Sequence, residues 1–306
     1  MKRVLILGAF AALILVGACE DTPTEPPTPK GPTFLGAWGS QGSGNGQFGN
    51  AVDVAVAANG NVYVIENSVF PVPGANDRVQ YFTSSGSFLG KWGSYGTGRG
   101  EFDAAMGIAV APNGNAYVAD NERVQYFSAT GSYLGEWYDG FLAPSGVAVA
   151  PNGNVYVSDI VKGRISYFTP TGSLLGSWYT GHREPAAVSV CSDGNVYVTD
   201  WAYYRVRYST PKGKYLGLWG SYGNGDGQFY CPSGIGIAPD GTVYVADSEL
   251  DRIQYFTAQG SFIGKFGARG SGGGQFYFPS GLAVAPSGNL YVADALNHRI
   301  QYFAPE

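Results

Sequence analysis

The side chains that could carry out chemistry are few in this chain. Its 306 residues include only two histidines, His182 and His298, which lie far apart in the sequence. A zinc site with three histidine ligands is therefore excluded within one chain. No G-x-S-x-G segment and no Ser-His-Asp set stands out as a nucleophilic centre. We predict no catalytic set, no metal site and no cofactor, and retain Asp53 only as a candidate for a catalytic group.

The acidic residues recur at one position of a repeated segment. The segment G-N-V-Y-V-x-D, or a close variant, occurs six times, with its tyrosines 39 to 54 residues apart. An acid ends each copy, and an arginine opens the apolar run that follows. We expect each acid to cap its own turn and to pair with that arginine through charge-assisted hydrogen bonds. The acids are Glu66, Asp120, Asp159, Asp200, Asp247 and Asp294, and the arginines are Arg78, Arg123, Arg164, Arg205, Arg252 and Arg299.

Function is expected where the copies differ, because a residue present in all six serves the shared architecture. Asp53 is one such departure, since the other copies carry Gly or Ala at its position. Its carboxylate could point into a central channel and act there, or it could make only a local turn contact.

A second departure groups aromatic and basic side chains in two neighbouring loops. Aromatic residues together with arginine are typical of binding hot spots, and stacked rings also suit sugars. The alternative is that some of these rings pack between the repeats. The candidate partner-binding residues are Tyr179, His182, Arg183, Trp201, Tyr203 and Tyr204.

Four long connectors share a glycine-rich pattern, of which residues 39–48 are an example. None leads into a helix, and none carries the Lys-Ser/Thr ending of a phosphate-binding loop, so we do not expect a nucleotide site. We expect the phenylalanine near the end of each connector to plug the hydrophobic core. These residues are Phe48, Phe102, Phe229 and Phe276.

The composition indicates that short strands position these residues. Aromatic residues make up 15% and charged residues 13% of the chain, and 47 glycines and 18 prolines interrupt it. These values exclude a disordered chain and a helical bundle. Each copy holds four short strands, and periods of about 40 to 50 residues with several short strands are typical of β-propellers. We predict an all-β, six-bladed β-propeller of four-stranded antiparallel blades.

The last copy ends after its third strand, and the missing fourth strand matches a segment near the other end of the chain, Phe34–Trp38. We predict that this segment pairs with Arg299–Phe303 and closes the ring, because closure removes exposed strand edges. Burial of Phe34, Leu35 and Trp38 is expected to stabilise the closed ring by about 5 kcal/mol.

The final copy resembles an NHL repeat in its segments Ser280–Val284, Gly288–Asp294 and Asn297–Phe303. The resemblance extends over residues 34–306 and implies a six-bladed β-propeller. The family pattern usually places an acid at the end of the inner strand. This chain has alanine or cysteine there instead, which lowers the expectation of polar or metal chemistry at that position. The residues at that position are Ala57, Ala111, Ala150, Cys191, Ala238 and Ala285.

Two cysteines fall within the repeats. Cys191 lies at one end of an inner strand and Cys231 near the opposite end of the next. A strand of five residues spans about 17 Å, which is too far for a disulfide. We predict two free, mostly buried thiols.

The N-terminal residues indicate export. Lys2 and Arg3 precede an apolar run too short to span a bilayer, which favours a signal peptide over residues 1–18. The run ends in Val-Gly-Ala before Cys19 and resembles the lipobox of bacterial lipoproteins, which implies lipidation of Cys19. The alternative is an ordinary secreted protein with an incidental Cys19. Residues 19–33 then form the lipidated cysteine and a proline-rich tether that reaches roughly 40 Å.

Together these patterns predict an exported, lipid-anchored binding module of the bacterial cell envelope, on the periplasmic or the surface face. Its loop face would bind a protein or a glycan partner. We expect a monomer and, because the net charge is −5, no nucleic-acid partner. The alternative is a channel-centred lactonase or lyase-type propeller enzyme around Asp53, which rests on analogy between folds alone.

Overall fold

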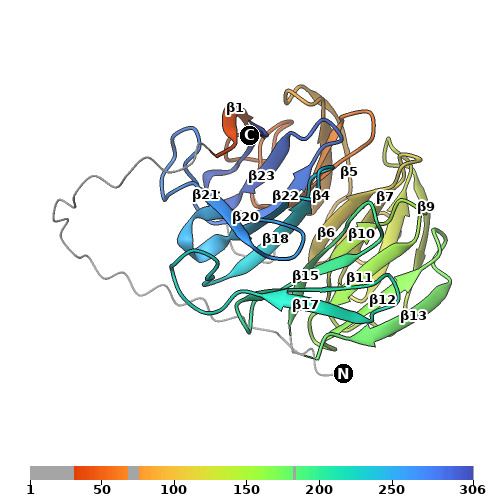
Figure 1. The fold of residues 1–306 in the computed structure, drawn as a ribbon. Helices are drawn as coiled ribbons and strands as arrows, with labels where there is room; N and C mark the ends of the chain where they lie inside the picture. The colour runs from red at the N-terminus through yellow and green to blue at the C-terminus, as the bar shows by residue number, and fades with distance from the viewer. Residues whose placement is uncertain (1–30, 68–75, 182–183, 306) are drawn as a thin grey trace.

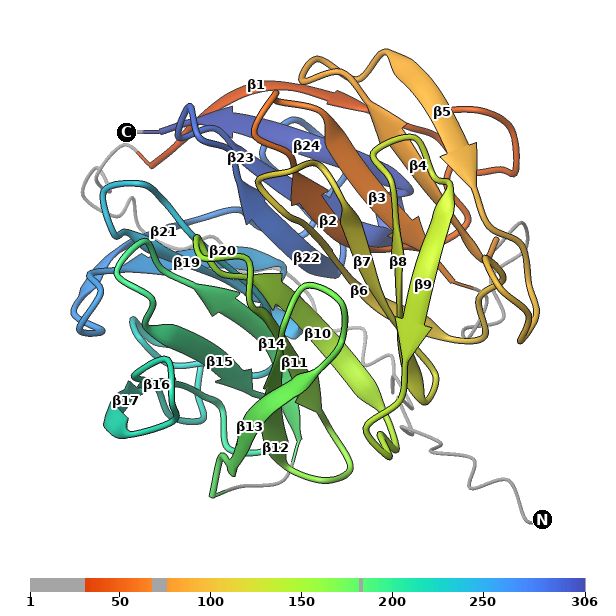
Figure 2. The same ribbon diagram turned by 90° about the vertical axis from the view of Figure 1, so that its right-hand side faces the viewer.

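Six four-stranded antiparallel sheets stand radially around one axis in the computed structural model (Figures 1 and 2). The structure describes residues 31–67, 76–181 and 184–305. Within each sheet the strands follow one another in chain order, except in the last sheet, where the order is β1-β24-β23-β22. The predicted all-β, six-bladed architecture is therefore confirmed. We number the sheets as blades 1 to 6, starting from the blade that holds β2.

The first strand of each blade lies nearest the axis, because it contacts the first strands of both neighbouring blades. These inner strands are β2 (Ala51–Val56), β6 (Ala105–Val110), β10 (Pro144–Val149), β14 (Pro185–Val190), β18 (Pro232–Ile237) and β22 (Pro279–Val284). The second strands are β3 (Val62–Glu66), β7 (Ala116–Asp120), β11 (Val155–Asp159), β15 (Val196–Asp200), β19 (Val243–Asp247) and β23 (Leu290–Asp294).

The outer half of each blade repeats in the same way. The third strands are β4 (Arg78–Phe82), β8 (Arg123–Phe127), β12 (Arg164–Phe168), β16 (Arg205–Ser209), β20 (Arg252–Phe256) and β24 (Arg299–Ala304). The outermost strands are β5 (Phe88–Trp92), β9 (Tyr133–Trp137), β13 (Leu174–Tyr179), β17 (Tyr215–Trp219), β21 (Phe262–Phe266) and β1 (Thr33–Trp38). Two 3₁₀ turns, η1 (Ser248–Leu250) and η2 (Ala295–Asn297), follow the second strands of blades 5 and 6.

The core lies between adjacent blades, whose second strands are buried along their whole length. Valine and tyrosine alternate there and suit a pleated surface buried on both faces. The four connector phenylalanines are fully buried, as predicted. Cys191 and Cys231 are free and buried, which confirms the two unpaired thiols.

Strand β1 closes the ring as predicted, antiparallel to β24, and lies beside it in Figure 2. The predicted burial was wrong for two of its three large residues, because Phe34 is 40% and Leu35 47% exposed. The physical reason is a β-bulge: the register shifts between Phe34 and Gly36, so Leu35 has no partner on β24 and lies on the solvent side of the outermost strand. Trp38 carries most of the packing, against Phe82, Tyr291 and Tyr302.

The inner strands of blades 5 and 6 approach each other closely at Gly234 of β18. A Cβ atom on Gly234 of β18 would lie 2.8 Å from the Leu282 nitrogen and 2.9 Å from the Gly281 Cα of the next blade. Backbone atoms of a neighbouring strand cannot rotate away, so we expect Gly234→Ala to lower the free energy of unfolding by about 1–3 kcal/mol in a urea titration.

The equivalent position of blade 4 supplies the control for this substitution. Ala187 already carries a methyl group there, so Ala187→Gly should lower the free energy of unfolding by no more than about 0.5–1 kcal/mol. Equal unfolding midpoints for Gly234→Ala and the parent protein would contradict the close approach of the two strands.

Candidate functional site

The connectors between blades and the loops between second and third strands emerge from the same side of the ring, because all strand pairs within a blade are antiparallel. We call this side the connector face. Of the predicted partner-binding residues that the structure describes, Trp201, Tyr203 and Tyr204 lie in a loop of this face and Tyr179 ends β13.

Acid–arginine pairs hold the loops and connectors of the connector face in place, and we call these pairs the frame. In blade 2, Asp120 accepts hydrogen bonds from the Arg123 Nε at 2.9 Å and from the Asp103 backbone nitrogen at 2.7 Å. The Arg123 guanidinium also donates to the backbone oxygens of Thr97, Gly98 and Glu101 in the preceding connector. The glycine-rich connector therefore wraps around the arginine, which confirms a structural role for this pair.

Five of the six predicted acid–arginine pairs are present, and the pair of blade 3 was predicted wrongly. Arg164 pairs with Asp139 at 2.6 Å, whereas Asp159 accepts hydrogen bonds from the backbone nitrogens of Leu142, Ala143 and Lys162. The short connector before blade 3 supplies Asp139 beside the guanidinium, and this second carboxylate replaces Asp159 as its partner.

Burial raises the pKa of two of these acids to about 6. It raises the pKa of Asp120 to about 6, against the lowering influence of the Asp103 backbone nitrogen and of Arg123. Burial likewise raises the pKa of Asp200 to about 6, although Arg205 opposes it. Both carboxylates remain ionised at neutral pH, where they hold their arginines.

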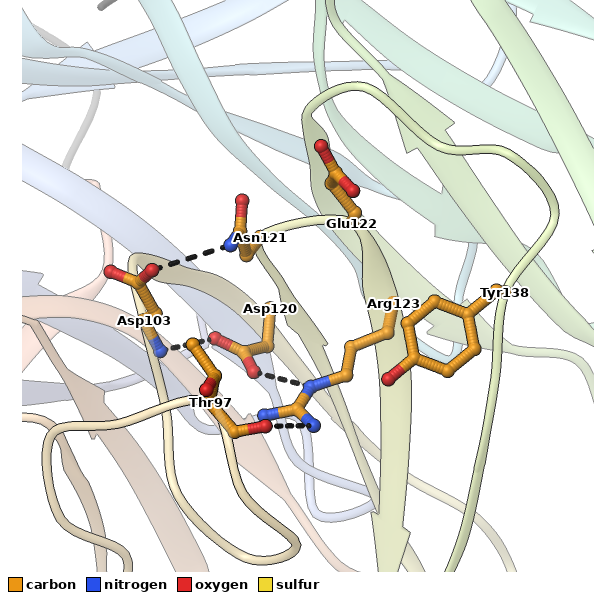
Figure 3. A pocket seen from close by; sticks show the side chains of 7 residues that line it. All are labelled: Thr97, Asp103, Asp120, Asn121, Glu122, Arg123 and Tyr138. Atoms are coloured by element: carbon orange, nitrogen blue, oxygen red, sulfur yellow. Dashed lines mark hydrogen bonds and ion pairs between the residues drawn. The ribbon is translucent and has the colours of Figure 1, made fainter. Parts of the chain in front are cut away.

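A shallow hollow of about 130 Å³ opens on the connector face of blade 2 (Figure 3). The loop after β7, which lines the hollow, has only two residues, Asn121 and Glu122, where blades 3 to 6 have four. Figure 3 shows Asp120 between the Asp103 backbone and Arg123 at its base. The lining residues are Thr97, Asp103, Asp120, Asn121, Glu122, Arg123 and Tyr138. Most of these groups bond to one another, so the hollow belongs to the frame.

Exposed tyrosines stand out on the connector face. Their exposed fractions reach 75% at Tyr179 and 66% at Tyr95. Tyrosine supplies a large, rigid contact surface with a polar end, which is why it is enriched where proteins bind partners. The exposed tyrosines of the connectors and loops are Tyr95, Tyr138, Tyr179, Tyr203, Tyr222 and Tyr277.

The ring contacts of this face centre on the seam between blades 4 and 5. Tyr204 contacts Tyr222 edge-to-face at 4.8 Å, and Tyr222 stacks on Tyr230 at 4.8 Å with an interplanar angle of 5°. Beside them, the Arg205 guanidinium lies 4.8 Å from the centre of the Tyr203 ring. We call Tyr204, Tyr222 and Tyr230 the tyrosine cluster.

The structure places the predicted patch residues unevenly. Tyr203 and Tyr204 lie in the loop after β15, and Tyr204 joins the tyrosine cluster. Trp201 is half-buried in the same loop, and its buried indole nitrogen has no hydrogen-bond partner among the residues that the structure describes. Tyr179 ends β13 and is paired with Arg164 of β12. His182, Arg183 and Cys19 lie outside the described residues.

Tyr222 and Tyr230 were missed by the sequence reasoning, although a signal for them exists. Tyr222 and Tyr230 lie eight residues apart in the connector before blade 5. The same two positions hold Tyr95 and Asp103 in the connector before blade 2, and Arg269 and Tyr277 in the connector before blade 6. The spacing of eight residues brings the two side chains together, since Arg269 also lies over the Tyr277 ring, at 4.6 Å. Aromatic residues at both positions therefore predict a stacked pair, and only the connector before blade 5 has two tyrosines there.

Asp53 lies at the inner end of the seam between blades 1 and 2. Its carboxylate accepts hydrogen bonds from the Val54 nitrogen at 2.9 Å and from the Ile108 nitrogen of the next inner strand at 3.0 Å. Burial raises the pKa of Asp53 to about 7, although both backbone donors lower it. No group of three or more His, Cys, Asp or Glu side chains that could hold a metal occurs in the described parts of the chain.

Six four-stranded sheets in a ring that β1 closes define this protein as a six-bladed β-propeller. The NHL repeat model matches residues 229–256 and 276–303, and each match runs from a connector phenylalanine into a third strand. The predicted resemblance is therefore confirmed over these two segments, which are NHL repeats. A comparison with curated proteins finds no match.

Solved structures share the fold. A structural genomics protein of unknown function from Bacteroides thetaiotaomicron matches with a TM-score of 0.68 and 17% identity, over 89% of this chain and 76% of its own. A streptogramin B lyase matches with a TM-score of 0.62 and 15% identity, over 86% and 96%. A catalytically inactive virginiamycin B lyase from Staphylococcus aureus, solved with quinupristin, matches with a TM-score of 0.58 and 15% identity, over 83% and 84%. At such identities the likeness shows the fold alone.

Proposed function

We propose that this chain is an exported, lipid-anchored binding module whose connector face binds a protein or glycan of the bacterial cell envelope. The observation that carries the proposal is the set of exposed tyrosines on this face. Rigid aromatic side chains in solvent bind partners at a small entropic cost.

The sequence of the N-terminus supports the cellular setting. A signal peptide over residues 1–18, lipidation at Cys19 and a proline-rich tether would hold the propeller away from the membrane. No helix in the described part of the chain is long and apolar enough to cross a bilayer.

We expect capture of an envelope partner to depend on the tyrosines of the connector face. Replacing Tyr95, Tyr138 and Tyr222 by alanine should reduce capture from a solubilised envelope fraction at least about tenfold, since each ring contributes to contact. Quantitative mass spectrometry and carbohydrate analysis of the captured material would measure the loss.

Exposed aliphatic residues on the outermost strands provide the control. A protein with Leu89, Leu134 and Leu216 changed to alanine should capture as much as the parent, because these side chains lie on the rim and not on the connector face. Loss of capture in the leucine variant, or full capture in the tyrosine variant, would place the partner elsewhere.

A lactonase or lyase-type enzyme is the second candidate, and the raised pKa of Asp53 favours it. A carboxyl group with a pKa near 7 is poised for general acid–base catalysis. However, both Asp53 oxygens accept backbone hydrogen bonds, and the bond from the Ile108 nitrogen joins blade 1 to blade 2. Stoichiometric calcium or zinc after mild purification, lost in Asp53→Ala, would favour the enzyme.

A further inference from the structure

Tyr204 occupies a backbone conformation that a large side chain rarely adopts. The four-residue loops of blades 3 to 6 all end in a residue with positive φ, and blades 3, 5 and 6 place Gly163, Asp251 and His298 there. These residue types tolerate the left-handed region, whereas a tyrosine with φ of 56° is strained. Such strain points to a function for the ring, which it directs against Tyr222.

Tyr222 is exposed and yet held in place. It keeps 61% of its surface in solvent, while Tyr230 supports it by stacking and Tyr204 by an edge contact. A hydrogen bond with Tyr230 also raises the pKa of Tyr222, so the phenol stays neutral. A ring fixed in this way loses little conformational entropy when a ligand stacks on it.

A carboxylate lies in the loop next to the tyrosine cluster. Glu249, in η1 of blade 5, follows Ser248, whose backbone nitrogen donates a hydrogen bond to the oxygen of Cys231 at 3.0 Å. Cys231 directly follows Tyr230. The charge of Glu249 contributes to the raised pKa of Tyr222, and burial followed by Asp247 raises the pKa of Glu249 itself. Glu249 makes no ion pair with any of the described residues. An exposed carboxylate offers hydrogen-bond acceptors to the hydroxyl groups of a ligand.

The connector segment that follows Tyr222 is polar and has few large side chains. The neighbouring connector residues 223–227 alternate glycine with exposed Asn224 and Asp226, so few side chains obstruct the Tyr222 ring. Protein-binding hot spots are usually surrounded by contacts that exclude water. This segment supplies hydrogen-bonding groups in place of such contacts.

We propose that the seam between blades 4 and 5 is a glycan-binding subsite. A pyranose ring stacks its C–H face on Tyr222 through apolar and weak C–H···π contacts, and Glu249 accepts hydrogen bonds from its hydroxyl groups. This inference rests on the proposed function and specifies the ligand class of the connector face. Neutral and N-acetylated sugars fit better than acidic sugars, because the seam carries the uncompensated charge of Glu249.

The test uses the full chain on an array of immobilised oligosaccharides that includes cellohexaose, chitohexaose and mannohexaose. The parent protein should bind at least one of them, and Tyr222→Ala and Glu249→Gln should each weaken that binding at least about tenfold. Tyr204→Asn should also weaken it while leaving the melting temperature at or above that of the parent, which a purely structural role for the ring would not produce.

Tyr215→Ala is the control. Tyr215 is also an exposed tyrosine, but it opens β17 at the end of the strand away from the connector face, so this variant should bind like the parent. The inference is overturned if the parent binds no oligosaccharide, or if Tyr222→Ala binds as the parent does. Tyrosine-dependent capture of an envelope protein, with an array on which nothing binds, would overturn the glycan subsite alone and leave the binding module intact.

Discussion

Removal of β1 is expected to destabilise the propeller by about 5 kcal/mol and to make it aggregate. The strand pairs with β24 from Thr33 to Trp38, and its loss would leave β24 as an unpaired edge. It would also uncover the rings that pack on Trp38 in blades 1 and 6. The loss of a large core aromatic side chain alone is worth about 3–5 kcal/mol.

Two truncations separate this effect from loss of the tether. A protein comprising residues 31–306 keeps β1, whereas residues 39–306 lack it. The second should melt about 10 °C lower than the first, and light scattering should show aggregates in the second alone. Equal melting temperatures would show that the ring does not depend on closure by β1.

Single substitutions locate the energy within the strand. Trp38→Ala should account for most of the loss, because Trp38 contacts three aromatic rings. Leu35→Ala should change the free energy of unfolding by no more than about 0.5 kcal/mol, since Leu35 is the exposed residue of the bulge.

The sequence predicted the ring because the ring is periodic. Four strands per copy, the acid and arginine at fixed places and a displaced outermost strand each follow from the repeated pattern. The exposure of Leu35 does not, because a bulge depends on how two strands pair. The Arg164–Asp139 pair was missed for a related reason: Asp139 lies in a connector that no other blade shares.

The candidate site was harder to predict because it combines segments of different repeats. Tyr204 was singled out as an irregularity in its loop, but its partners Tyr222 and Tyr230 belong to a connector that resembles three others. Only a comparison of those four connectors, position by position, separates the tyrosine pair from Tyr95 with Asp103. The strain at Tyr204 depends on φ, which residue types alone do not reveal.

The stability of the protein is expected to fall as the pH rises towards 7, and Asp53 should be the main cause. Burial raises its pKa from 3.8 to about 7, so the folded state holds this proton more tightly than the unfolded chain. The resulting stabilisation is complete below pH 3.8 and is lost as the pH rises through 7. At about 1.4 kcal/mol per pKa unit, the change amounts to roughly 4 kcal/mol.

Asp53→Asn isolates this contribution, because Asp120 and Asp200 titrate in the same direction and remain in the variant. An amide of the same shape cannot ionise. The difference in the free energy of unfolding between the variant and the parent should therefore rise by about 4 kcal/mol in favour of the variant when urea titrations at acid and at slightly alkaline pH are compared. Glu122→Gln, at an exposed loop position, is the matched control for the removal of one carboxylate. Parallel pH profiles for Asp53→Asn and the parent would contradict the raised pKa. If the pH profiles confirm this loss of stability, blade 1 keeps a carboxylate that destabilises the protein near neutral pH, at a position where every other blade has Gly or Ala. Such a residue is expected to serve a function.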